Sequence, residues 1–139
     1  MSQTDVHQLR RVLRSSRAQT AMIVEDEAII AFSLEDGFTD AGFEIVGPFS
    51  ACAHALTSLA RDLPDVAILD AILSDGPCLE LARELRVRGV PFLIYSGASD
   101  FRGHAPELEG TPWVEKPAPF EVVLACARKL LGGEPGVPG

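Results

Sequence analysis

Three carboxylates, Glu25, Asp26 and Asp70, each follow a short apolar stretch of the chain and could together bind a cation. Glu25 and Asp26 come after residues 21–24, and Asp70 comes after residues 66–69. Like charges held close together are costly unless a cation lies between them. Oxygen ligands suit Mg²⁺, whereas a zinc site would favour His or Cys. The alternative, that such acids only cap turns or helices, stays open for each residue taken singly.

A hydroxyl and an ammonium group follow two further apolar stretches, at Ser96 and Lys116. Beside a carboxylate and a metal ion, these groups are suited to phosphoryl transfer, because the lysine and the metal neutralise phosphoryl oxygens. The Ser96 hydroxyl and the backbone N–H groups of Ala71 and Gly97 would orient the same oxygens. Asp70 would then attack in line and become an aspartyl phosphate.

These side chains can meet only if the apolar stretches form neighbouring strands that end at one edge of a sheet. Runs of Val, Ile and Leu without polar alternation are typical of parallel strands covered on both faces, and ligands bind at the carboxyl ends of such strands. Five strand signals alternate with helix signals, which predicts a flavodoxin-like, doubly wound (βα)5 fold with strand order 2-1-3-4-5. The expected strands are residues 21–24, 43–46, 65–70, 91–96 and 111–115.

Apolar residues at helical spacing predict the helices between these strands. These apolar positions lie within residues 29–38, 55–59, 79–87 and 120–131, and Gly42 is expected just past the end of the first helix. Ser50 is the expected N-cap of the second helix, and Glu27 is interpreted as a helix-terminal acid at the start of the first. Residues 98–110 contain Gly103, Pro106 and Gly110, so a fourth helix there should be short or irregular.

The composition fits one domain. The chain has 139 residues, 47% of them hydrophobic, which is enough for a single core without disulfides. We expect residues 1–19 to be an Arg-rich extension, either frayed or an arm for a partner, and residues 133–139 to be a disordered tail. The net charge of -8 argues against a nucleic-acid surface.

The three cysteines, Cys52, Cys78 and Cys126, are widely spaced and have no histidine at metal-ligand spacing. We interpret them as small buried side chains in a reducing compartment. The chain lacks both a long apolar run and the apolar segment of a signal peptide. The sequence therefore predicts a cytoplasmic protein that is not bound to a membrane.

Four motifs in this order resemble the receiver domain of two-component response regulators, over about residues 20–132. They are Ile-Val-Glu-Asp-Glu at 23–27, Ile-Leu-Asp at 68–70, Tyr-Ser-Gly at 95–97 and Glu-Lys-Pro at 115–117. The resemblance implies that Asp70 is the phosphoacceptor and a Mg²⁺ ligand. The resemblance also implies that Glu25 and Asp26 form the acidic metal pocket, in which Asp26 is the ligand nearer to the metal. The backbone carbonyl of Ile72 would be a further protein ligand.

The resemblance also implies roles for three residues beyond the metal pocket. Ser96 is expected to be the switch hydroxyl, Lys116 to bind the phosphoryl group, and Trp113 to be the switch aromatic. The alternative that Trp113 is an ordinary core aromatic has equal weight. Residues 71–77 depart from the receiver pattern, because the loop is shorter and Pro77 follows Gly76. Together with residues 89–92, this loop is similar to that of stand-alone receivers in alphaproteobacteria, and we expect it to differ most from relatives.

The function implied is that of a single-domain response regulator, which catalyses nothing beyond its own phosphoryl transfer and dephosphorylation. Its phosphoryl donor would be a histidine kinase or a histidine phosphotransfer protein, and its output a contact with a downstream protein or service as a phosphate sink. A homodimer through the fourth-helix face or the Arg-rich arm is a further expectation. Two alternatives stay open: a binding module that signals without phosphorylation, and a Mg²⁺-dependent phosphohydrolase that uses Asp70 as a transient nucleophile.

Overall fold

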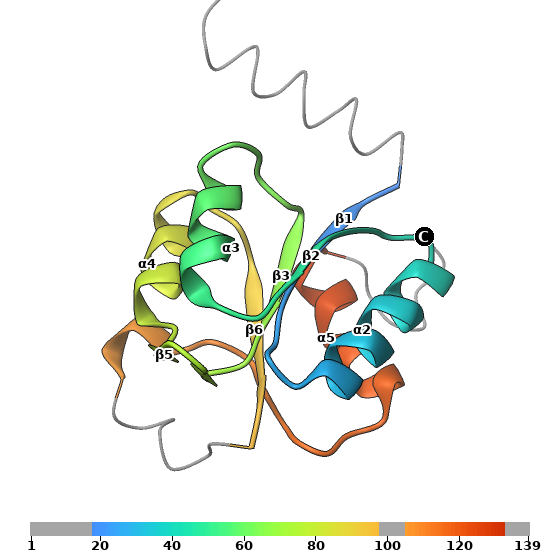
Figure 1. The fold of residues 1–139 in the computed structure, drawn as a ribbon. Coiled ribbons are helices and arrows are strands. Elements are labelled where there is room, and N and C mark those ends of the chain that lie inside the picture. Colours follow the sequence, from blue (N-terminus) through green and yellow to red (C-terminus); the bar gives the residue numbers. More distant parts are fainter. Residues whose placement is uncertain (1–17, 98–104, 133–139) are drawn as a thin grey trace, which may run out of the picture.

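The chain forms a five-stranded parallel sheet covered on both faces by helices (Figure 1). The computed structural model describes residues 18–97 and 105–132. Most of the Arg-rich extension, residues 98–104 and the expected tail lie outside the described residues. The sheet has the order β2-β1-β3-β6-β7, which is the predicted order when its five strands are counted along the chain. The strands are β1 (Thr20–Val24), β2 (Glu44–Phe49), β3 (Val66–Leu69), β6 (Phe92–Ser96) and β7 (Trp113–Glu115).

The central strands are apolar because they are buried on both faces. Every residue of β3 is buried, as are four of the five residues of β1. The two strands pair in parallel from Ala21 opposite Val66 to Val24 opposite Leu69. The pairing continues one step further, where the Asp70 N–H donates to the Val24 carbonyl at 2.9 Å. The residues that follow β1 and β3 therefore emerge together at one edge of the sheet.

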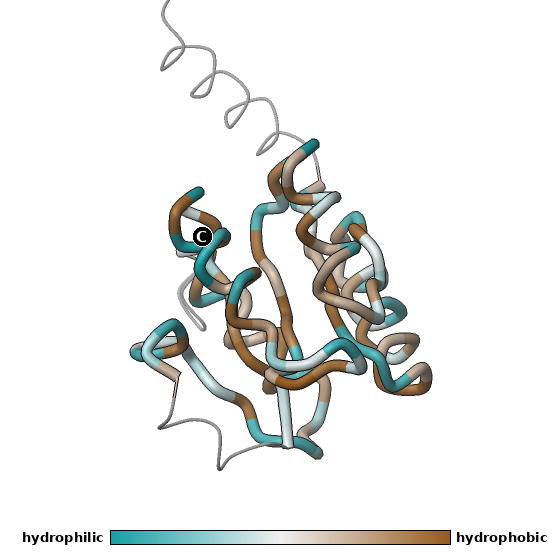
Figure 2. The backbone as a smooth tube through the Cα atoms, turned by 60° about the vertical axis from the view of Figure 1, so that its left-hand side comes forward, coloured by the Kyte–Doolittle hydropathy of each residue, from teal (hydrophilic) through white to brown (hydrophobic). Residues whose placement is uncertain are grey.

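Two pairs of helices enclose the sheet. Helices α2 (Ala28–Asp40) and α5 (Phe120–Leu130) lie on one face, and α3 (Cys52–Leu59) and α4 (Leu79–Val87) lie on the other (Figure 1). Buried side chains of α2 and α5, such as Phe38 and Val123, pack on Ile23 and Ile68. Figure 2 shows hydrophobic stretches running through the middle of the molecule, between helices on which hydrophobic and hydrophilic residues alternate. This alternation is what the helical spacing in the sequence predicted.

The predicted end of the second strand was wrong. Strand β2 continues through Gly47 and Pro48 to Phe49, although a Gly-Pro pair usually marks the end of a strand. Gly47 has a φ of +100°, and a Cβ placed on it would lie 2.9 Å from the Ile23 carbonyl oxygen. Glycine therefore allows β2 to stay close to β1, and the Glu25 N–H still donates to the Phe49 carbonyl at 2.8 Å.

The predicted N-cap of the helix after β2 was also wrong. Ala51, not Ser50, is the N-cap of α3, and its side chain makes no capping hydrogen bond. The helix N-terminus is capped instead from another part of the chain, because the Asp75 carboxylate accepts hydrogen bonds from the N–H groups of Cys52 at 3.2 Å and Ala53 at 3.3 Å.

The prediction that the fourth helix is short or irregular is confirmed for residues 105–110, the part of the predicted segment that the structure describes. A 3-10 helix, η2 (Pro106–Leu108), is all the regular structure between residue 105 and β7. Arg86 of α4 holds this region, since its guanidinium donates to the carbonyl oxygens of Glu107 at 2.9 Å and Glu109 at 2.8 Å. Leu108 is buried beneath it.

A short hairpin after β3 was not predicted. Strands β4 (Ile72–Leu73) and β5 (Gly76–Pro77) pair antiparallel and form a separate two-stranded sheet. It occupies the loop that the sequence marked as unusual.

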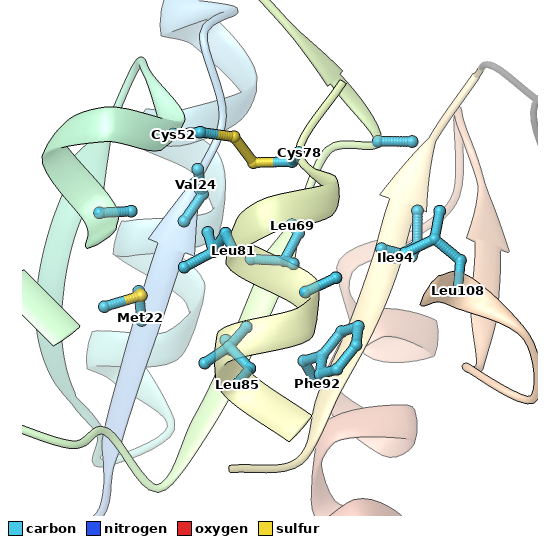
Figure 3. Close-up of a cluster of buried hydrophobic side chains, with 14 of the residues drawn as sticks. Met22, Val24, Cys52, Leu69, Cys78, Leu81, Leu85, Phe92, Ile94 and Leu108 are labelled. Carbon is cyan, nitrogen blue, oxygen red and sulfur yellow. A yellow bond between two sulfur atoms is a disulfide. The ribbon is translucent and has the colours of Figure 1, made fainter. Parts of the chain in front are cut away.

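The expectation that all three cysteines are unpaired was wrong. Cys52 and Cys78 form a disulfide, with their Cα atoms 5.8 Å apart, whereas Cys126 is free (Figure 3). This pairing was not predictable from local sequence patterns, because 26 positions separate the two residues. They meet because α3 and α4 are neighbours on the same face of the sheet.

A membrane-spanning helix is absent from the described part of the chain, since no helix there combines the required length with sufficiently apolar composition.

Candidate functional site

The polar residues singled out in the sequence lie together at the carboxyl edge of the parallel sheet. Glu25 and Asp26 follow β1, Asp70 follows β3, Ser96 ends β6, and Lys116 follows β7. The backbone fixes the last two relative to each other, because the Lys116 N–H donates to the Ser96 carbonyl at 3.1 Å. Strand pairing alone thus brings residues more than 90 positions apart in the sequence to one site.

Asp70 is at the centre of this site and is only 8% exposed. Its Oδ1 atom accepts a 2.6 Å hydrogen bond from the Ser96 hydroxyl and a 3.4 Å hydrogen bond from the Ile72 N–H. Its Oδ2 atom accepts a hydrogen bond from the Lys116 ammonium at 3.0 Å. The two oxygens therefore face different donors, a neutral hydroxyl on one side and a cation on the other.

Lys116 contacts three carboxylates. Its Nζ atom lies 2.7 Å from Glu25 Oε1, 2.9 Å from Glu27 Oε2 and 3.0 Å from Asp70 Oδ2. Partial burial opposes the charge on the ammonium, but its hydrogen bonds to Glu25, Glu27 and Asp70 outweigh that effect and raise the pKa of Lys116 above its usual range. The lysine is therefore a permanent cation in this site.

Glu25 is more buried than its neighbours, with 3% of its surface exposed. Burial raises the pKa of its carboxyl group, and the nearby Asp70 charge acts in the same direction. The hydrogen bond from Lys116 and the 3.1 Å hydrogen bond from the Glu27 N–H oppose this rise. The site thus keeps a buried carboxylate only with the help of neighbouring donors.

Glu25, Asp26 and Asp70 form a set that could hold a metal ion. Each offers a carboxylate oxygen, and these oxygens all lie within 4.8 Å of one another. Asp26 is exposed, so its oxygen faces outward from the buried pair. Because the set consists of oxygens alone, it fits a hard divalent cation such as Mg²⁺ and not a metal that favours nitrogen or sulfur.

The backbone groups singled out in the sequence also lie here. Ala71 is buried, and its carbonyl accepts a hydrogen bond from the Cys78 N–H at 3.1 Å. A Cβ added to Gly97 would lie 3.9 Å from the Lys116 Cβ, which places Gly97 beside the lysine. The roles expected for their N–H groups, and for the Ile72 carbonyl, stay predictions.

Trp113 lies on β7 and pairs with Ile94 of β6. Its half-buried side chain packs against the apolar cluster between the sheet and helices α3 and α4. This position agrees with the interpretation of Trp113 as a core aromatic, and a switch role in addition stays a prediction.

Two contacts of Lys116 were not anticipated. Glu27 is the N-cap of α2 by position but makes no capping hydrogen bond, and its carboxylate binds Lys116 instead. The buried Tyr95 ring lies below the lysine, with 5.8 Å between the ammonium and the ring centroid. The Tyr95 hydroxyl also donates to the Ala118 carbonyl at 3.2 Å. The run of three acids at 25–27 was the available signal for Glu27, whereas Tyr95 stood inside an apolar strand and carried none.

A comparison with protein families decides what kind of domain this is. The model of one family, described as the response regulator receiver domain, matches residues 21–128. The chain belongs to this family. Receiver domains are signalling phosphoacceptors, so the predicted family and broad role are confirmed.

Curated relatives of this receiver are longer proteins, named as transcriptional regulators. The probable transcriptional regulatory protein TcrX of Mycobacterium tuberculosis is 28% identical over 116 residues, covering 81% of this chain and 49% of that protein. The virulence transcriptional regulatory protein PhoP of Shigella flexneri is 29% identical over 120 residues, covering 84% of this chain and 53% of that protein. The chain therefore spans about half the length of the curated relatives it matches.

Solved receiver structures have the same fold. SdrG from Sphingomonas melonis Fr1 is 32% identical, with a TM-score of 0.68 over 83% of this chain and 96% of that one. A response regulator receiver protein from Sinorhizobium medicae WSM419 is 26% identical, with a TM-score of 0.73 over 83% of this chain and 95% of that chain. The receiver domain of the sensor histidine kinase PA1611 from Pseudomonas aeruginosa PAO1 is 18% identical, with a TM-score of 0.74 over 84% of this chain and 99% of that chain. That structure has a magnesium ion coordinated in its active-site cleft. The flavodoxin-like fold is thus confirmed.

Proposed function

We propose that Asp70 of this receiver accepts a phosphoryl group, in the presence of Mg²⁺, from a phosphohistidine on a histidine kinase or a histidine phosphotransfer protein. The observation that carries the proposal is the environment of Asp70. Its carboxylate lies between the Ser96 hydroxyl at 2.6 Å and the Lys116 ammonium at 3.0 Å, and two further carboxylates are near enough to share a metal ion.

In this proposal Glu25, Asp26 and Asp70 hold the Mg²⁺ ion, and the Ile72 carbonyl is a fourth protein ligand. The oxygen-only donor set supports this assignment, as does the magnesium ion in the receiver domain of PA1611. When bound, Mg²⁺ would supply positive charge that neutralises the phosphoryl oxygens and the surrounding acids.

The residues of the chain then have distinct tasks in the transfer. A carboxylate oxygen of Asp70 forms a bond to phosphorus as the phosphorus–nitrogen bond of the donor breaks, and the bonding electron pair stays with the donor imidazole. Lys116, which keeps its charge because of its raised pKa, moves from the Asp70 carboxylate to a phosphoryl oxygen. The Ser96 hydroxyl and the N–H groups of Ala71 and Gly97 donate to the remaining oxygens.

The proposed output is a shift between two conformations. The phosphoryl group adds negative charge at the edge of the sheet, Ser96 moves toward it, and Trp113 follows into the space that is vacated. A downstream protein would bind the altered surface, or the chain would serve as a phosphate sink. We place the protein in the cytoplasm, because the ATP that charges histidine kinases is found there.

The test is phosphorylation by acetyl phosphate with Mg²⁺, followed by intact mass spectrometry. We expect an adduct of one phosphoryl group, lost in Asp70→Asn and in excess chelator. Asp40→Asn is the matched control, since Asp40 is exposed at the end of α2 that is far from the site, and it should keep the adduct. An adduct that persists in Asp70→Asn would reject the proposal.

The same experiment separates the two alternatives. A binding module that signals without phosphorylation predicts no adduct with any small donor. A phosphohydrolase predicts steady turnover of a phosphomonoester. Glu25 and Glu27 do not favour the hydrolase, because both carboxylates are bonded to Lys116 and neither is a free base for activating water.

A further inference from the structure

The disulfide between Cys52 and Cys78 joins the N-termini of two helices next to the Asp70 loop. Cys52 is the first residue of α3, and Cys78 is the N-cap of α4. Cys52 is 8% exposed and Cys78 is 3% exposed, and Figure 3 shows the bond at one end of the apolar cluster. Cys78 follows Asp70 by eight positions, so the bond is close in sequence to the phosphoacceptor.

Hydrogen bonds connect Cys78 directly to the Asp70 loop. The Cys78 N–H donates to the carbonyl of Ala71, the residue after Asp70, at 3.1 Å. The Ile72 N–H in turn donates to Asp70 Oδ1 at 3.4 Å. The position of Cys78 therefore bears on Ala71, which lies between the two residues joined by this second hydrogen bond.

The hairpin between Asp70 and Cys78 is held against α3 by two further links, both polar. The Asp75 carboxylate accepts hydrogen bonds from the first two N–H groups of α3, as described above. The Ser74 hydroxyl donates to the Ser50 carbonyl at 3.2 Å. The Ser74 hydrogen bond and one of the two Asp75 hydrogen bonds are exposed to solvent, where a hydrogen bond contributes little net stability. The covalent bond is therefore the strongest attachment of this hairpin to α3.

The sulfur of Cys78 lies where a leaving thiolate is favoured, because N–H groups at the N-terminus of α4 stabilise a negatively charged sulfur. The N-terminus of α3 differs, since its first two N–H groups already donate to the Asp75 carboxylate. Ala53 and Pro77, which adjoin Cys52 and Cys78 in sequence, are exposed. Cys126 contrasts with the pair, because it lies inside α5 and burial raises the pKa of its thiol.

We propose that Cys52 and Cys78 are a reversible thiol–disulfide site for a small thiol of the glutathione class, and that its redox state sets how firmly the Asp70 loop is held. The coupling to phosphorylation rests on the function proposed above, and the expectation that the bond is reversible rests on the cytoplasmic location proposed there. In such a reducing compartment, a disulfide that persists without exchange would be unusual, and a reversible one is the common kind.

The exchange is a two-electron reaction in two steps. A glutathione thiolate attacks the sulfur of Cys52, the less buried of the two residues, and the sulfur–sulfur bond breaks with its electron pair leaving on Cys78. A second glutathione thiolate attacks the mixed disulfide and releases glutathione disulfide and the Cys52 thiolate. Each cysteine thiolate then takes up a proton. Oxidation by glutathione disulfide is the reverse sequence.

The oxidised form should be the better phosphoacceptor. With the bond closed, Ala71 and Ile72 are held in place, and the oxygens and N–H groups of the site are arranged before the donor arrives. With the bond open, the hairpin depends on its polar contacts. Coupling of this kind typically changes a rate or an affinity by about 3- to 30-fold.

The first experiment tests the redox site alone. The full chain with Cys126→Ser is equilibrated in glutathione buffers of varied ratio, its thiols are alkylated, and intact mass is measured. We expect two thiols to appear together with a single midpoint in the glutathione range while circular dichroism stays native. The site is rejected if the bond never forms, or if it opens only when the protein unfolds.

The second experiment tests the coupling with two readouts. Reduced and oxidised forms of the Cys126→Ser protein are compared for the rate of Mg²⁺-dependent labelling by acetyl phosphate and for hydrogen exchange of residues 71–78. We expect slower labelling and faster exchange after reduction, and no redox dependence when Cys52→Ser and Cys78→Ser are added. Equal hydrogen exchange in the two forms overturns the coupling. Absence of labelling in both forms, with exchange still redox-dependent, refutes the proposed function and leaves the redox site standing.

Discussion

The ammonium of Lys116 lies 2.7 Å from Glu25, a proposed metal ligand, which is closer than its 3.0 Å contact with Asp70. The lysine therefore occupies part of the site that a divalent cation would fill. Binding of a cation and a phosphoryl group must redistribute these contacts, since Lys116 leaves the carboxylates as the phosphoryl oxygens take their place.

Replacing Lys116 by Met should slow phosphorylation of Asp70 strongly. Methionine keeps the approximate volume of the lysine side chain but lacks the cation that faces the negative charge developing on the phosphoryl oxygens. Removal of such a donor typically lowers the rate by about 10²- to 10³-fold. Labelling by acetyl phosphate measured by intact mass gives the rate. Lys129→Met, an exposed position on α5, is the matched control and should label normally. Unchanged labelling of Lys116→Met would show that the lysine does not contact the phosphoryl group.

Replacing Glu27 by Gln should speed the same reaction. Its carboxylate is exposed and competes for the Lys116 ammonium at 2.9 Å, and its charge also repels an anionic donor. Exposed ion pairs are weak, so we expect a gain of about two- to fivefold that shrinks at high salt. Glu44→Gln, at the opposite end of the sheet, controls for the change in net charge. A slower Glu27→Gln protein would indicate that Glu27 positions the lysine productively.

Replacing Glu25 by Gln should stabilise the metal-free protein increasingly as pH rises. Because burial raises the pKa of Glu25 in the folded state, folding disfavours its ionised form. The wild-type protein thus loses this part of its stability as pH increases from the ordinary glutamate pKa through the raised one. The gain from Glu25→Gln should be absent below that range and reach its full size above it.

Urea unfolding in chelator at several pH values measures this difference. The same variant should lose most of the stabilisation that excess Mg²⁺ gives the wild-type protein, since ligand binding stabilises the folded state by mass action. A variant that is less stable than wild type at neutral pH, or that keeps the full response to Mg²⁺, contradicts the expectation. Glu35→Gln, at a half-buried position of α2, is the control.

The arrangement of the sheet was predictable because its strands carry strong local signals. Strand β3 is an apolar run that ends in Asp70, and the same pattern recurs before Glu25 and Ser96. Parallel pairing then requires residues that follow adjacent strands to meet. The site residues were therefore found from strand ends, without any side-chain geometry.

The parts that the sequence did not predict depend on contacts between distant segments. Asp75 caps α3 by accepting hydrogen bonds from Cys52 and Ala53, which lie 23 and 22 positions earlier in the sequence. Cys78 bonds to Cys52 across a separation of 26 positions. No local pattern marks either contact. Glu27 was assigned to a helix terminus on its position, but the nearby ammonium of Lys116 is a stronger partner than the helix N–H groups.

Replacing Asp75 by Asn should lower the melting temperature and loosen the hairpin. Hydrogen bonds from the N–H of Cys52 lead the effects that hold the pKa of Asp75 below its usual range, and the N–H of Ala53 adds to them. The carboxylate therefore contributes stability above the ordinary aspartate pKa, and this contribution disappears as pH falls through the lowered value. We expect a decrease of a few degrees at neutral pH, largest when the disulfide is reduced, because the cap and the bond secure the same hairpin. Thermal melts of the oxidised and reduced forms measure this decrease. Asp36→Asn, on the exposed side of α2, is the control. A decrease of equal size in the two forms would show that the Asp75 cap and the disulfide act independently.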